Sequence, residues 1–76
     1  MKPKNHYSGD SKWLEDRFND ICGLCGFNAA ISVLEKYSSV YAEAHDKEPL
    51  QQKKDGAARR EANSKLIRTI ANLKKK

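Results

Sequence analysis

One stretch near the middle of the first half decides the fold: Ile21-Cys22-Gly23-Leu24-Cys25-Gly26-Phe27. It holds two glycines and both cysteines of the chain among bulky apolar residues. Patterns typical of amphipathic helices lie on each side of it. Gly26 is suited to end a helix, because glycine adopts positive φ without strain. The stretch therefore predicts an elbow between two helices, and we expect Leu24 and Phe27 to bury it.

Upstream of the elbow, a first helix is expected, with Asp10 or Ser11 as its cap. Its apolar residues recur every three or four positions and share one face: Leu14, Phe18, Ile21 and Cys25. Residues 1–10 show no such periodicity. We expect a flexible N-terminal tail there, followed by a single domain over residues 11–76.

Downstream of the elbow, Asn28 is the expected cap of a second helix. Its apolar stripe is Ala30, Leu34, Tyr37, Tyr41 and Ala44, widened by Val33 and Val40. The resulting arc of about 120° is wide enough to contact two neighbouring elements. Pro49 disfavours helical backbone at Glu48, so this helix should end near Asp46.

A third helix fills the end of the chain, starting either at Asp55-Gly56 or at Pro49. Its apolar stripe is Ala58, Ala62, Leu66, Ile70 and Leu73. No strand-like alternation competes with these patterns. The sequence therefore predicts an all-α, three-helix domain, in which a helical hairpin about the elbow is followed by a basic C-terminal helix.

The chain is short for a domain that stands alone. Its 76 residues are 38% apolar, and a core of this size contributes only about 3–5 kcal/mol net. The thin core and the wide apolar arc of the second helix predict a homodimer. No stretch approaches the roughly 18 apolar residues of a membrane span, and no apolar run follows Met1. We therefore expect no membrane partner and a cytoplasmic location.

Positive charge is concentrated in the last third of the chain. Residues 1–52 carry a net charge of −2, whereas residues 53–76 carry +7. Such asymmetry indicates a polyanionic partner, either nucleic acid or an acidic protein surface. The candidate nucleic-acid-binding residues are Lys53, Lys54, Arg59, Arg60, Lys65, Arg68, Lys74 and Lys75. The simpler explanation is a solvated helix face with a lysine tail.

The elbow also resembles the first helix and turn of a DNA-binding helix-turn-helix. Cys22, Gly26 and Phe27 stand where that motif has a small residue, a turn glycine and a hydrophobe. The resemblance covers about twenty residues and then degrades, since Ser32 falls on the next core position. The supposed recognition helix offers no Arg or Lys in its first turn, and these residues commonly read bases. A plain helical hairpin is therefore favoured.

Cys22 and Cys25 form a Cys-x-x-Cys that resembles half of a zinc knuckle. Zinc takes four ligands, and neither His6 nor His45 lies at the spacing of a compact finger. A dimer would supply four cysteines instead. A redox role is disfavoured, because the dipole at a helix C-terminus opposes a thiolate. We expect buried, free thiols and no cofactor, with zinc at Cys22 and Cys25 as the alternative.

No signature of an enzyme is present. The glycine-rich spot lacks the Lys and Ser/Thr of a phosphate-binding loop, and a domain this small has little room for a substrate pocket. The first hypothesis is a non-enzymatic accessory or regulatory protein, without a small-molecule substrate, that binds nucleic acid through its basic C-terminal helix. The alternative is a regulator or inhibitor that docks on a larger protein or ribonucleoprotein complex through Trp13, Tyr37 and Tyr41.

Overall fold

The computed structural model describes residues 2–75; Met1 and Lys76 lie outside the described residues. Its elements in chain order are the 3₁₀ turn η1 (Ser8–Asp10), the helices α1 (Ser11–Cys25) and α2 (Phe27–Lys47), the 3₁₀ turn η2 (Gln51–Lys53), and the helix α3 (Lys54–Lys74). Residues 2–75 contain no strand. The prediction of an all-α, three-helix domain is confirmed.

The elbow between α1 and α2 is a single residue. Gly26 has φ 94° and ψ 169°, a region open almost only to glycine. Its N–H closes α1 by donating to the carbonyl of Cys22 at 2.8 Å, and its carbonyl accepts from the N–H of Ala30 at 3.2 Å. Helix α2 therefore starts at Phe27, one residue before the predicted cap Asn28.

The expectation that Leu24 and Phe27 bury the elbow was wrong. Leu24 is 52% exposed and Phe27 is 60% exposed. The buried face of α1 ends at Ile21, and Leu24 lies three residues further, where the helix turns it toward the edge of that face. Because the turn at Gly26 is so short, no loop folds back over these two side chains.

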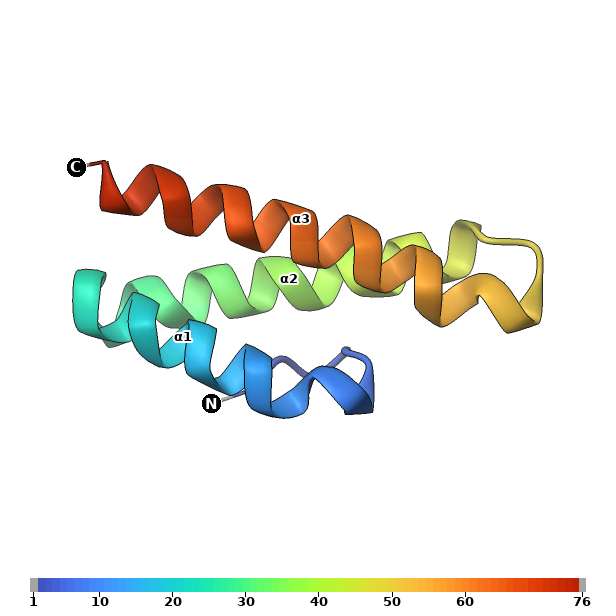
Figure 1. Ribbon diagram of the computed structural model, residues 1–76, viewed down its shortest axis with the longest axis horizontal. Coiled ribbons are helices and arrows are strands. Elements are labelled where there is room, and N and C mark those ends of the chain that lie inside the picture. Colours follow the sequence, from blue (N-terminus) through green and yellow to red (C-terminus); the bar gives the residue numbers. More distant parts are fainter. Residues whose placement is uncertain (1, 76) are drawn as a thin grey trace.

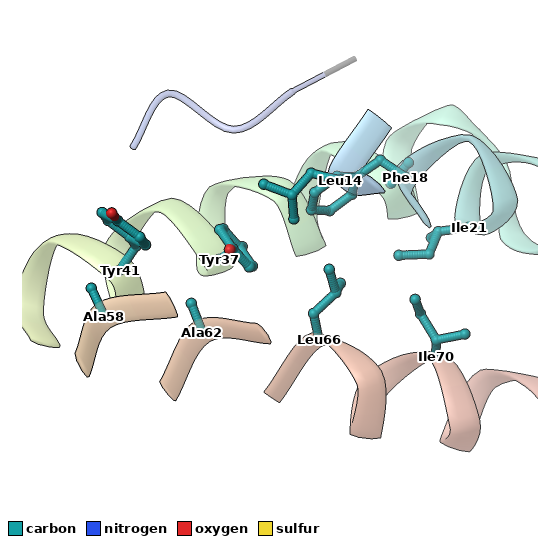
Figure 2. Packing of buried hydrophobic residues seen from close by; sticks show 10 residues of the cluster. Leu14, Phe18, Ile21, Tyr37, Tyr41, Ala58, Ala62, Leu66 and Ile70 are labelled. Atoms are coloured by element: carbon teal, nitrogen blue, oxygen red, sulfur yellow. The ribbon is translucent and has the colours of Figure 1, made fainter. Parts of the chain in front are cut away.

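The core lies between all three helices. Helix α3 runs antiparallel to α2, and α1 packs against the same pair (Figure 1). Leu14, Phe18 and Ile21 of α1 point toward Leu66 and Ile70 of α3 (Figure 2). The apolar stripe predicted for the third helix is thus the one that the fold buries.

Small and large side chains alternate across the interface between α2 and α3. Tyr41 lies over Ala58, and Tyr37 lies over Ala62 (Figure 2). Both alanines are fully buried or nearly so. Alanine at these positions leaves room for the two tyrosine rings, as close packing of helices requires.

Residues 2–10 contact the helices at several points. Pro3 is fully buried, and the N–H of Asn5 donates to Oγ of Ser38 at 3.0 Å. The ring of His6 bridges the carbonyl of Pro3 at 2.7 Å and Oγ of Ser11 at 2.9 Å. These polar contacts carry no hydrophobic periodicity, so the sequence did not indicate them.

The connection from α2 to α3 is held by Lys54. Helix α2 ends at Lys47, one residue beyond the predicted end, and α3 begins at Lys54, between the two predicted starts. Lys54 Nζ donates to the carbonyls of His45 at 3.0 Å and Glu48 at 2.7 Å. It thereby satisfies carbonyls that a helix end leaves without partners.

Within residues 2–75, none of the helices combines the length and the apolar character that crossing a bilayer requires.

Candidate nucleic-acid interface

The structure divides the predicted basic residues into two groups. In the first group, Lys54 caps α2, and Lys65 Nζ lies 3.3 Å from a carboxylate oxygen of Glu61. Arg59 donates from Nε and Nη2 to the two carboxylate oxygens of Asp10, at 2.7 and 2.8 Å. The Arg59 guanidinium also lies over the ring of Tyr7, 4.5 Å from its centroid. These three cations already have partners within the chain.

The second group is free. Within residues 2–75, Lys53, Arg60, Arg68, Lys74 and Lys75 have neither a side-chain hydrogen bond nor an ion pair, and all five are exposed. At about 100° per residue, the last four lie on the side of α3 away from its buried stripe. We call Arg60, Arg68, Lys74 and Lys75 the basic face. From Arg60 to Lys75 it extends about 22 Å along the helix.

A buried carboxylate keeps Arg59 out of the basic face. Asp10 is only 9% exposed and also accepts from Nδ2 of Asn63 at 3.3 Å. The hydrogen bond from Arg59 holds the pKa of Asp10 below its ordinary value, although burial acts in the opposite direction. Asp10 therefore stays charged at neutral pH, and it neutralises Arg59.

The hydroxyls of two buried tyrosines of α2 form hydrogen bonds with side chains of α3. Tyr37 donates to Oδ1 of Asn63, and burial raises its pKa to about 12. Tyr41 donates to Oδ1 of Asp55 at 2.8 Å, and burial also raises its pKa. Nε2 of His45 lies 3.5 Å from the same Asp55 oxygen. Each buried tyrosine hydroxyl thus has a hydrogen-bond partner, as buried polar groups usually do.

This placement changes the set of partner-binding candidates. Tyr37 is 4% exposed and Tyr41 is 5% exposed, so the structure places both rings in the core and not on the surface. Their position on the apolar stripe of the second helix is the physical reason. Trp13 is partly buried, with the Arg17 guanidinium 5.9 Å from its ring centroid.

The cysteines are less buried than expected. Cys25 is exposed and Cys22 is half-buried, and both are free thiols. Cys25 is the last residue of α1, beyond the buried face that ends at Ile21. In the described part of the chain, no group of three or more His, Cys, Asp and Glu side chains is placed to hold a metal ion.

A groove along the seam of α2 and α3 was not predicted from the sequence. One hollow has a cavity volume of about 350 Å³, and its floor includes Val33, Tyr37, Val40 and Leu66. Three cations stand at its rim: Lys36, Lys65 and Arg68. The available signal was the extra width that Val33 and Val40 give to the apolar arc of α2.

No protein-family model, curated protein or solved structure matches this chain.

Proposed function

We propose that the protein is a non-enzymatic accessory or regulatory protein that associates with nucleic acid through the basic face of α3. The observation that carries the proposal is the set of cations Arg60, Arg68, Lys74 and Lys75, which point away from the core and have no acidic partner among the described residues. Lysine and arginine placed in this way neutralise phosphates and release counterions, which supplies affinity without reading the base sequence.

The neighbouring cations differ from the basic face, because they have partners within the chain. Arg59, Lys54 and Lys65 are each paired inside the chain, so they contribute structure in place of phosphate contacts. Helix α3, which carries the basic face, contains no aromatic residue. Proteins that bind single strands without sequence preference stack the bases on aromatic side chains. The proposal is therefore binding to the phosphate backbone of a duplex.

The test compares two triple variants with equal loss of charge. The variant Arg60→Gln, Lys74→Gln, Lys75→Gln removes three cations of the basic face. The control Lys2→Gln, Lys4→Gln, Lys12→Gln removes three exposed cations elsewhere. Binding to a fluorescent DNA or RNA duplex is measured by anisotropy over a range of salt concentrations, with circular dichroism to check the fold.

For wild type, the logarithm of the association constant should fall linearly with the logarithm of the salt concentration. The basic-face variant should lose about 0.9 from the slope on duplex DNA for every phosphate contact removed, and it should weaken binding to all sequences alike. The control should bind like wild type. Equal losses in both variants would mean that net charge alone matters, and absence of binding at about 50 mM salt would remove the proposal.

A further inference from the structure

The face of the α2–α3 pair that α1 does not cover is a groove along the seam. All residues lining the hollow of about 350 Å³ belong to α2 or α3. A second hollow of about 390 Å³ adjoins the first, because Val40 and Lys65 line both. Between Val33 and Lys47 the groove runs about 21 Å, or about four helical turns.

The floor of the groove is apolar. Val33 and Val40 pack against the core from this side and are only partly buried. Tyr37 and Leu66 close the bottom beneath them. Two antiparallel helices with an apolar seam accept a further helix by interlocking of side-chain ridges, and an additional helix here would complete a four-helix bundle.

Cations stand on both walls at one end of the groove. Lys36 rises from α2, whereas Lys65 and Arg68 rise from α3. Lys36 and Arg68 have no ion pair within residues 2–75. The other end is lined by Glu43, Glu48 and Glu61, together with Lys47. Glu43 pairs with Lys47 at 3.0 Å, and Glu61 pairs with Lys65 at 3.3 Å. The charge of the groove therefore differs between its two ends, and the end nearer the elbow is positive.

We propose that this groove binds an acidic amphipathic helix of a partner protein. Its apolar stripe, spaced i, i+3, i+4 and i+7, would lie on Val33 and Val40, as in other helix-in-groove complexes. Carboxylates flanking both edges of that stripe would pair with Lys36 on one wall and Arg68 on the other. The acidic half of the partner helix lies nearer the elbow, since the unpaired cations Lys36 and Arg68 stand at that end. At the other end the lysines of the described lining are already paired with Glu43 and Glu61.

Other occupants fit the groove less well. A second copy docked by a two-fold axis would place this patch against itself. It would offer few free carboxylates to Lys36 and Arg68, because Glu43 and Glu61 already pair with lysines of their own chain. A nucleic acid gains little from an apolar floor, because phosphates bind cations and polar groups. Arg68 is the one residue that the groove shares with the basic face; the groove proposal rests on its apolar floor and on Lys36 as well, and it does not depend on nucleic-acid binding.

The probe is a pair of labelled helical peptides of about 18 residues, long enough for the four turns. Both peptides carry leucines at positions i, i+3, i+4 and i+7. The acidic probe has glutamates flanking the leucines in one half, and the basic probe has lysines at the same positions. Fluorescence anisotropy measures both affinities. Methyl NMR of Val33, Val40 and Leu66 reports whether the peptide lies in the groove.

The decisive variant is Lys36→Glu with Arg68→Glu. Its matched control is Lys2→Glu with Lys12→Glu, which makes the same change of charge at exposed positions that neither line the groove nor belong to the basic face. Wild type and the control should prefer the acidic probe about tenfold, and the groove variant should reverse that preference. Methyl shifts should be confined to the groove in wild type.

Several results would overturn the proposal. They include equal binding of the two probes, no binding at about 100 µM, and a preference that survives Lys36→Glu with Arg68→Glu. Concentration-dependent shifts of the same methyl groups without peptide would show that a second copy occupies the groove. Shifts produced there by duplex DNA, and not by the acidic probe, would assign the groove to nucleic acid.

Discussion

Arg59 and Arg60 are adjacent and chemically identical, yet the structure gives them opposite roles. Arg59 forms a bidentate pair with Asp10, whereas Arg60 is exposed on the far side of α3. The difference comes from the 100° that separates neighbours on a helix and from a carboxylate 49 residues away in sequence. Charge composition predicted both as phosphate ligands, because a long-range pair leaves no local pattern.

Asp10→Asn should expose how much this pair contributes. The substitution removes a charged acceptor from Arg59 and Asn63 and should lower the free energy of unfolding at pH 7 by about 1–2 kcal/mol. The control Asp20→Asn breaks an exposed pair with Arg17 and should cost at most about 0.5 kcal/mol. Urea denaturation followed by circular dichroism measures both.

The same pair should make stability depend on acid pH. Arg59 lowers the pKa of Asp10 in the folded protein. The ion pair therefore contributes fully to the free energy of unfolding above the unfolded pKa of about 3.9, and this contribution is lost as the pH falls through the lower folded value. The gap between wild type and Asp10→Asn should therefore shrink as pH drops below about 4. A gap that is constant with pH would mean that packing at residue 10, and not its charge, matters.

Among the elements, the elbow shows what a sequence pattern can and cannot predict. The end of α1 at Gly26 followed from the special backbone freedom of glycine, and the apolar stripes of α2 and α3 followed from helical spacing. The exposure of Leu24 did not follow, since a periodic pattern says which side chains share a face but not where the neighbouring helix stops covering it. The α2–α3 groove was missed for the same reason.

Two glycine substitutions test the geometry of the elbow. Gly26→Ala forces a side chain into a conformation with φ of 94° and should destabilise the protein by about 1–3 kcal/mol. Gly23→Ala lies inside α1, where an added Cβ meets nothing within 4 Å, and should stabilise by up to about 1 kcal/mol through helix propensity. Thermal unfolding should show opposite shifts. Equal effects would mean that Gly26 does not hold this conformation.

The whole molecule is elongated, with principal extents of 39 × 20 × 16 Å. Its wide apolar arc on α2 is covered partly by α1 and α3 of the same chain, so that arc is a weaker reason for dimerisation than the sequence suggested. The exposed apolar side chains of Leu24 and Phe27, at the elbow, provide another reason to expect a dimer. The elbow between α1 and α2 lies at the end of the molecule away from the α2–α3 connection (Figure 1).

Self-association through the elbow is the remaining prediction. Wild type should form dimers at micromolar concentration, because association removes Leu24 and Phe27 from water at about 25 cal/mol per Å² of apolar area. Leu24→Gln with Phe27→Gln should give monomers. The control Leu50→Gln changes a side chain that is 45% exposed at the opposite end and should leave the dimer intact. Sedimentation equilibrium measures all three, and a folded wild-type monomer at about 100 µM would contradict the prediction.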